Sequence, residues 1–264
     1  MCAMLMRRLK IITAIIFAGA GAAYAYRPFI ATDAAVAGLH EVETELGYFN
    51  AARNGDATTY TIPQVVINYG IWDGMEAVGQ FNVNRTNGAS THVGENELNL
   101  KVVAKEGFLQ DRPGDSVAFE TALLLPSGEP GEHFVGFQET GIWSHRLLGM
   151  TFHINLGGGV DQFDQDGFVS WGTIAERPIT QKLRIVGEID GQGQHEFLPN
   201  NSGLLGLIWE SPRPDLFFDA GVRRGLSSGA DDWQFTTGLT YGFTFPKSPG
   251  TLPRETIGEP RRPE

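Results

Sequence analysis

The sequence predicts an all-β fold: a transmembrane, antiparallel, up-and-down β-barrel of about 12 strands, preceded by a cleaved signal peptide. Three observations support this prediction. Strand-like segments of about 10 residues alternate large apolar residues with small or charged ones. Their connections alternate between short and long. The chain also begins with an export signal, after which no apolar stretch approaches the roughly 20 residues that a membrane-spanning helix needs.

Residues 1–25 have the pattern of a secretory signal peptide. A basic start precedes a short apolar run at 11–23, and Ala23-Tyr24-Ala25 is a small-x-small cleavage site. A membrane anchor is the alternative, but the run is shorter than the roughly 20 apolar residues that cross a bilayer. Cys2, the only cysteine, lies in this segment, so the mature chain would hold no disulfide.

Composition and charge narrow the classes of partner. The 31 acidic residues outnumber the 20 lysines and arginines, and no basic patch is interleaved with aromatics, so we expect no nucleic-acid partner. The 34 glycines and the aromatic share of 11% favour a β protein with many turns and close approaches between strands.

Strand-like segments follow one another along the mature chain. In the first, Glu41, Glu43 and Glu45 alternate with Val42 and Leu46, and the same period of two recurs in each strong segment. In the last, WQFTTGLTYGFTF, most of the alternate positions hold large aromatic residues, and threonine, glutamine and glycine lie between them. The strong segments are 40–50, 58–71, 75–84, 96–105, 116–125, 150–158, 182–190, 216–225 and 233–245; fainter ones, assigned by spacing, are 133–145, 165–177 and 203–210.

The connections between these segments indicate two different ends. Outer-membrane barrels have short periplasmic turns and longer external loops, whereas both ends of a soluble sandwich face water. The segment 106–116 breaks the alternation. The short connections are 72–74, 145–149, 177–180 and 211–215, and the longer polar ones are 85–95, 126–133, 161–167 and 191–202.

The charged residues decide which face of the sheet lies inside. They fall on the faces that lack large apolar side chains. In a soluble barrel the apolar faces would form the core, but about twelve strands enclose an interior too wide for side chains to fill. We therefore expect the apolar faces to meet lipid and the charged faces to line a wet lumen. The predicted channel-lining residues are Glu43, Glu45, Glu76, Gln80, Glu97, Lys101, Glu120, His153, Arg184, Glu188, Asp219 and Arg223.

Opposite charges are unevenly distributed along this predicted lumen. The glutamates up to Glu120 lie on the first half of the barrel, while Arg184 and Arg223 lie on the second half. Facing acids and bases would set up a transverse field and narrow a permeation path. Alternatively, the same residues would form a structural salt-bridge plug.

Nothing in the sequence indicates catalysis. The histidines are dispersed, and no G-x-S-x-G nucleophile elbow occurs. Ser144 and His145 are adjacent, so on a strand their side chains would point to opposite faces. His153, beside Asn155, would face the lumen as a hydrated side chain or as part of a polar constriction. We therefore assign no catalytic residue, metal ligand or cofactor, and we expect no enzymatic activity.

Six short segments of the mature chain carry a family resemblance. They are RPFIATDAA (27–35), INYGIWDGMEAVGQ (67–80), ENELNLKVVAK (95–105), SVAFETALLLPSGEPG (116–131), LGMTFHINLGGG (148–159) and GLTYGFTF (238–245). In this order they resemble outer-membrane β-barrels of the phenol meta-pathway degradation family, a transporter-like group. The chain departs from the family pattern at Ala34, Glu97 and Ser127, where the family has a second acid, an aspartate and a threonine. The resemblance implies uptake of aromatic or other hydrophobic compounds.

These observations together predict the organisation and role of the chain. We expect a signal peptide at 1–25, a periplasmic lead-in at 26–38, the barrel at 39–245 and a disordered, proline-rich periplasmic tail at 246–264. The expected location is the outer membrane of a Gram-negative bacterium, with membrane lipid, a small-molecule solute and the barrel-assembly machinery as partners. The expected function is passive or facilitated uptake of small solutes. A non-conducting structural or surface-interaction barrel and an outer-membrane lipid-modifying enzyme are the alternatives.

Overall fold

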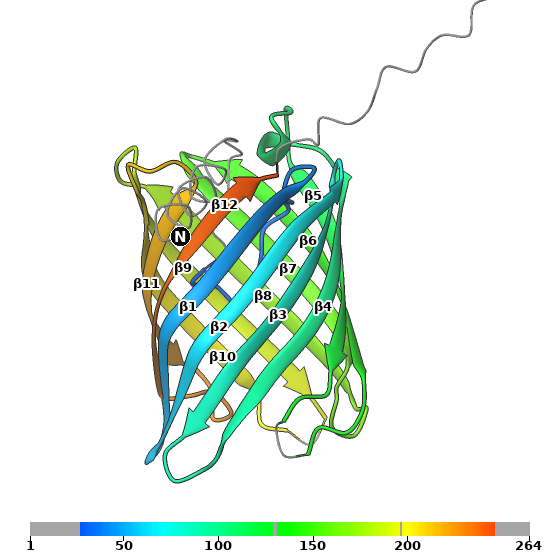
Figure 1. Ribbon diagram of the computed structural model, residues 1–264, viewed down its shortest axis with the longest axis vertical. Helices are drawn as coiled ribbons and strands as arrows, with labels where there is room; N and C mark the ends of the chain where they lie inside the picture. The colour runs from blue at the N-terminus through cyan, green and yellow to red at the C-terminus, as the bar shows by residue number, and fades with distance from the viewer. Residues whose placement is uncertain (1–26, 129–130, 196, 246–264) are drawn as a thin grey trace, which may run out of the picture.

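Twelve antiparallel strands close into one barrel in the computed structural model, which describes residues 27–128, 131–195 and 197–245 (Figure 1). Each strand pairs with the next along the chain, and β1 pairs with β12 to close the sheet. The predicted up-and-down transmembrane barrel is thereby confirmed. The strands are β1 (Glu41–Asn54), β2 (Ala57–Trp72), β3 (Met75–Thr86), β4 (Thr91–Lys105), β5 (Ser116–Leu125), β6 (Gly136–Leu147), β7 (Met150–Val160), β8 (Gly167–Pro178), β9 (Leu183–Gln194), β10 (Asn200–Glu210), β11 (Leu216–Gly225) and β12 (Trp233–Thr244).

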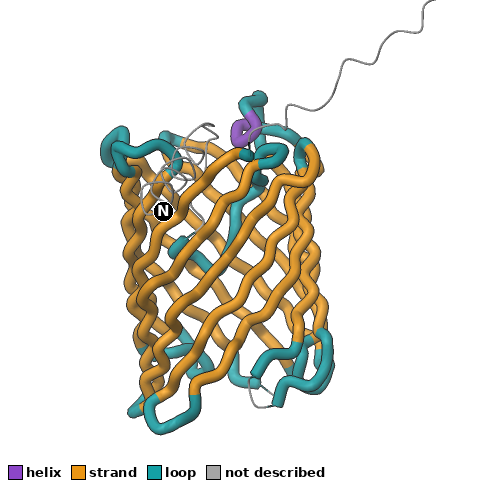
Figure 2. Tube along the Cα trace, viewed as in Figure 1, coloured by secondary structure: helices purple, strands orange, loops and turns teal. Residues whose placement is uncertain are grey.

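The strands run obliquely around the barrel wall (Figure 2). They are between 10 and 16 residues long, enough for tilted strands to cross the apolar part of a bilayer. Closure leaves no sheet edge, so ladder hydrogen bonds satisfy the backbone groups that lipid cannot. A single short 3₁₀ helix, η1 (Phe108–Gln110), is the one helix among the described residues, and nothing helical there is long and apolar enough to span a membrane.

The side chains confirm the expected orientation of the two faces. On β12, Phe235 is 51% exposed on the outside, whereas the neighbouring Thr236 is buried inside. On β1, Glu43 and Glu45 are buried in the barrel although both are acidic. Leu98, on β4, is 54% exposed. Large apolar residues therefore form the outer belt, and the charged ones point into the lumen.

The two ends of the barrel differ as the connection lengths indicated. Tight turns at 72–75, 147–150, 178–183 and 210–216 lie at the end where β1 begins and β12 finishes, together with η1. Gly74 and Gly149 have positive φ angles of 75° and 74°, which glycine adopts without steric cost. Most of the longer loops lie at the opposite end, and we call this the loop end. The connections between strands are thus short at one end of the barrel and mostly longer at the other.

Two loops are shorter than the sequence suggested. β4 begins at Thr91, because its pairing with β3 continues as far as Arg85 opposite Thr91. β10 begins at Asn200, which pairs with Gln192 on β9. The polar residues of these segments extend the strands at the loop end of the barrel.

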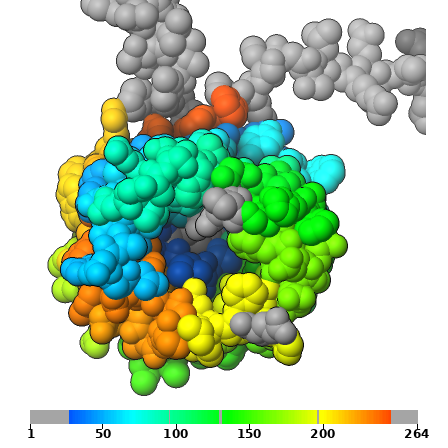
Figure 3. All heavy atoms as spheres, turned by 90° about the horizontal axis from the view of Figure 1, so that it is seen from below, coloured from blue at the N-terminus to red at the C-terminus, as the bar shows by residue number. Residues whose placement is uncertain are grey.

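The segment expected to be a periplasmic lead-in lies inside the barrel instead. Residues 27–38 run through the lumen, and we call them the inner segment (Figure 2). Seen from the loop end, the first described residues, in dark blue, lie within the central hollow (Figure 3). The physical reason is that lumenal side chains supply hydrogen-bond partners for the inner segment. The expected signal peptide at 1–25 and tail at 246–264 lie outside the described residues.

Candidate functional site: the barrel lumen

Side chains from the barrel wall bind the backbone of the inner segment. Ile30 N donates to both carboxylate oxygens of Glu188 at 3.0 and 3.2 Å, and Ala31 N donates to the same carboxylate at 2.7 Å. Asn155 holds Thr32 from both sides: its Oδ1 accepts from Thr32 N at 3.1 Å and its Nδ2 donates to Thr32 O at 2.7 Å. The wall thus replaces the water that an extended chain would bind.

Two further contacts continue this pattern toward β1. Ala34 N donates to Ser144 Oγ at 3.1 Å, and Ala37 N donates to Glu76 Oε2 at 2.7 Å. The acceptors come from β6 and β3, so the inner segment crosses the width of the lumen. It therefore narrows the barrel at the end where β1 begins.

Arg27 anchors the start of the inner segment. Its guanidinium donates to Gln64 Oε1 at 2.6 Å and to Thr236 Oγ1 at 2.7 Å, and it pairs with Asp219 at 3.5 Å. These partners stand on β2, β12 and β11, across the junction that closes the barrel. The sequence analysis gave Arg27 no role, because nothing in its position beside the predicted cleavage site indicates which side chains it contacts.

Inward-facing glycines make room for the inner segment. A Cβ at Gly47 would lie 2.6 Å from Arg27 Nη1, and one at Gly238 would also collide with the Arg27 guanidinium. A Cβ at Gly172 would lie 2.7 Å from the Ala31 Cβ. Real side chains do not approach this closely. These glycines on the inner faces of β1, β8 and β12 therefore leave space for the inner segment.

The buried bases pair with acids on the same wall rather than across the lumen. Lys101 Nζ lies 3.5 Å from Glu76 Oε1 on the neighbouring strand, and Arg184 Nη1 lies 2.8 Å from Glu176 Oε2. Arg223 binds the carboxylate of Glu188, two strands away. These ion pairs join residues one or two strands apart, because leaving a buried charge without a near partner is costly.

A second polar network joins three strands. Ser144 Oγ and His153 Nδ1 are 2.8 Å apart, and His153 Nε2 lies 3.5 Å from Glu176 Oε1. The sequence drew attention to His145 as the neighbour of Ser144, but strand register brings His153 to it instead. Ser144 is fully buried, and its oxygen accepts the Ala34 N–H, so this network holds the inner segment.

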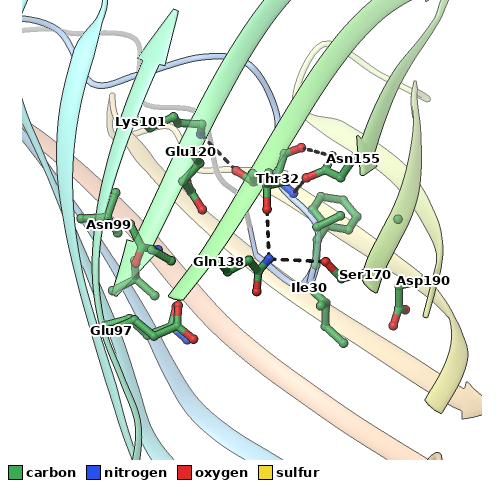
Figure 4. A pocket seen from close by; sticks show the side chains of 18 of the residues that line it. Ile30, Thr32, Glu97, Asn99, Lys101, Glu120, Gln138, Asn155, Ser170 and Asp190 are labelled. Atoms are coloured by element: carbon green, nitrogen blue, oxygen red, sulfur yellow. Dashed lines mark hydrogen bonds between the residues drawn. The ribbon is translucent and has the colours of Figure 1, made fainter. Parts of the chain in front are cut away.

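Between the inner segment and the loop end lies a cavity of about 470 Å³ (Figure 4). Its walls combine carboxylates with amide and hydroxyl side chains, such as Asn99, Gln138 and Ser170. Figure 4 shows Thr32 of the inner segment at its inner boundary. Six of the twelve residues that we predicted to line the lumen border this cavity: Glu45, Glu76, Gln80, Glu97, Lys101 and Glu120.

The other six predicted residues lie elsewhere in the barrel. Glu188 binds the inner segment, and Asp219 pairs with Arg27. Glu43 is buried on the inner face of β1, two residues before Glu45. The three remaining residues each lie beside a carboxylate: His153, Arg184 and Arg223.

Several residues of the site were missed in the sequence. Glu176 and Asp190 bind predicted residues, but both occur in strands whose other polar positions looked equally plausible. Asn99 and Gln138 border the cavity, and uncharged amides on an inner face carry no signal that separates a lining residue from a hydrated one. Thr32 could have been found only by placing its segment inside the barrel.

Asp115, which lies outside the strands, has a pKa that its neighbours lower. Asp115 precedes β5 beside η1, and its carboxylate lies 2.7 Å from His145 Nδ1 and accepts from Trp143 Nε1 at 3.0 Å. The hydrogen bond with His145 is the main cause of a lowered Asp115 pKa, although desolvation acts in the opposite direction. These contacts of Asp115 with β6 hold the connection between β4 and β5, which is the longest one at this end of the barrel.

Comparison with known proteins reveals similarity of fold. The chain is similar to an outer membrane channel from Pseudomonas putida F1, with a TM-score of 0.58 and 10% identity over 82% of this chain and 100% of that one. It is also similar to the NanC porin, with a TM-score of 0.55 and 9% identity over 76% of this chain and 98% of that one. No protein-family model and no curated protein matches the sequence. The closed barrel with its apolar outer belt is an outer-membrane fold, as the sequence indicated.

Proposed function

We propose that the protein is an outer-membrane channel for passive or facilitated diffusion of small solutes. One observation carries the proposal: a cavity of about 470 Å³, with polar walls, lies inside a barrel whose outer belt is apolar. Such a compartment offers a solute hydrogen bonds in place of its hydration shell. The finer assignment, uptake of aromatic compounds as in the phenol meta-pathway degradation family, rests on the sequence resemblance and belongs to the same proposal.

The inner segment favours a second candidate, a barrel that does not conduct. Its hydrogen bonds to Glu188, Asn155, Ser144 and Glu76 cross the lumen beside the cavity. A solute must pass beside this segment or displace it. If neither happens, the barrel is a structural or surface-interaction protein with a closed interior.

Single-channel recording from the purified protein in planar bilayers separates the two candidates. Discrete current steps that scale with salt concentration support the channel, whereas a silent bilayer with correctly folded protein supports the closed barrel. Aromatic uptake is tested by liposome swelling with phenol and with a sugar of low permeability as the reference. Equal rates with and without the protein would contradict uptake of phenol.

A further inference from the structure

Three neighbouring strands carry a row of cationic and aromatic side chains on the outer face, at the loop end. The strands are β11, β12 and β1, which lie side by side in the closed barrel (Figure 1). Trp233 begins β12, and strand pairing places Arg53 opposite it on β1 and Arg224 opposite it on β11. Directly opposed residues share a face, and Trp233 is 45% exposed on the outside. Both arginines are exposed as well, and we call these three residues the Arg–Trp–Arg row.

The contacts of the two guanidiniums leave most of their donors available. Arg224 Cζ lies 4.6 Å from the centre of the Trp233 ring, and Arg224 Nη1 donates to Asp232 O at 2.7 Å. Arg53 Nε donates to Gly55 O at 2.9 Å, while the Asp232 carboxylate accepts from Gly55 N. Each guanidinium thus spends one of its five N–H donors on a backbone carbonyl. Neither forms an ion pair with a carboxylate in the described part of the chain, so the row presents two positive charges to an anion.

The row borders the apolar belt of the barrel. The next outward positions on the same strands are Ala51, Phe235 and Val222, which stand opposite one another. Phe235 and Val222 are both exposed, and so is Leu205, opposite Val222 on β10. Two residues of a strand span about 7 Å, so the cationic row and the apolar row lie at successive depths. The longer loops of outer-membrane barrels face the exterior, which places these rows in the outer leaflet.

A third arginine widens the cationic surface. Arg85 on β3 is exposed and stands opposite Tyr60 on β2, which in turn stands opposite Ala51 on β1. Arg85 therefore shares the outer face and lies two strands from Arg53. Neighbouring strands are about 4.8 Å apart, so the backbones of Arg53, Arg85 and Arg224 are separated by about 10 Å or more. A ligand that meets all three carries more than one anionic group.

We propose that the Arg–Trp–Arg row, together with Arg85, binds the phosphate groups of lipid A, a glycolipid with two phosphates and several acyl chains. Arginine binds phosphate through two parallel N–H···O bonds, and charge-assisted bonds of this kind are the stronger ones. The tryptophan ring suits the headgroup level of the membrane, and the exposed apolar row beneath it meets the acyl chains. The inference goes beyond solute diffusion, because the site lies outside the lumen and does not depend on conduction.

Native mass spectrometry of the purified protein in detergent measures the binding of three lipids: lipid A with both phosphates, lipid A with one phosphate, and phosphatidylglycerol. EDTA is present, so divalent cations cannot bridge a lipid to Asp56 or Asp231 in the adjoining connections. Lipid A with both phosphates should bind most tightly. The double variant R53Q/R224Q should raise its apparent dissociation constant by about tenfold or more, because the charge-assisted contacts are lost.

A matched control removes the same charge from the opposite end of the outer face. Arg177 on β8 is exposed and stands opposite Ile185, which is also exposed, at the end with the tight turns. R177Q should therefore leave the dissociation constant of lipid A unchanged. Folding of each variant is checked by its heat-modifiable migration. The single variant R53Q is used if the double variant does not fold, with an expected rise of about threefold or more.

An unchanged dissociation constant in a folded R53Q/R224Q protein would overturn the site. An equal loss of affinity in R177Q would overturn it as well, since any outward arginine would then contribute as much. Phosphatidylglycerol that binds as tightly as lipid A, and is weakened equally by R53Q/R224Q, would make the row a surface for anionic lipids in general and overturn the assignment to lipid A. None of these results bears on the proposed function, which single-channel recording tests separately.

Discussion

Glu188 ties the inner segment to the barrel wall, so replacing it tests whether that segment closes the lumen. In Glu188→Ala, Ile30 N and Ala31 N both lose their acceptor. Arg223 loses one carboxylate but keeps Asp190 and Ser202, which limits the damage to the wall itself. We therefore expect the inner segment to leave its position while the barrel stays folded.

The expected size of the effect follows from the two lost hydrogen bonds. A hydrogen bond to a charged group contributes about 1.5–3 kcal/mol, so two of them contribute about 3–6 kcal/mol to docking of the segment. Solvent screening does not reduce this figure much, because the Glu188 side chain has no exposed surface. With about 1.4 kcal/mol for each factor of ten, the ratio of docked to undocked segment should fall by about 100-fold or more.

Thiol labelling measures this ratio directly. Cys2 is the only cysteine of the chain and lies in the predicted signal peptide, so Ala31→Cys would place a single thiol on the inner segment. The labelling rate with a membrane-impermeant maleimide should rise at least tenfold in Glu188→Ala. Single-channel current should rise with it, because the narrow part of the lumen widens.

Glu188→Gln is the matched control for this experiment. It keeps an acceptor oxygen of nearly the same shape and removes only the charge, so its effect should be smaller than that of alanine. Unchanged labelling and unchanged current in correctly folded Glu188→Ala would refute the reasoning. The segment would then be held by its other contacts, or would not control the lumen.

Three further changes test other parts of the structure. Gly47→Val should displace Arg27 and cost about 1–3 kcal/mol, measured by equilibrium unfolding in urea, and a Gly47→Ser variant should cost less. Ser144→Ala should cost about 1–3 kcal/mol in the same assay, since the buried Ala34 N–H loses its acceptor. Asp115→Asn should remove a pH-dependent contribution: the lowered pKa stabilises the fold above the usual carboxyl pKa of about 3.9 and is lost as pH falls through the lowered value, so both proteins should converge in acid.

The period of two along the strands, together with the connection lengths and the positions of the charged residues, predicted the barrel. On β12 most of the outward positions hold large aromatic or apolar residues and the positions between them hold threonine, glycine or glutamine, and on β1 three glutamates share one face. Side chains of neighbouring residues on a strand must point to opposite sides, so the sequence alone determines which residues share a face of the sheet. The approximate number of strands followed from the spacing of these segments, even where the patterns of β8 and β10 were faint. The difference between the two ends of the barrel followed from the lengths of the connections.

Only the tertiary structure decided what those inward residues meet. Whether Ser144 faces His153, or Arg223 reaches Glu188, depends on the register between strands, which closure of the whole barrel sets. The position of the inner segment could not be predicted either, because a segment that is neither strand nor helix has no periodic pattern of apolar residues to indicate which way it faces. Its place is set by acceptors and glycines far away in the sequence, and these come together only when the sheet closes.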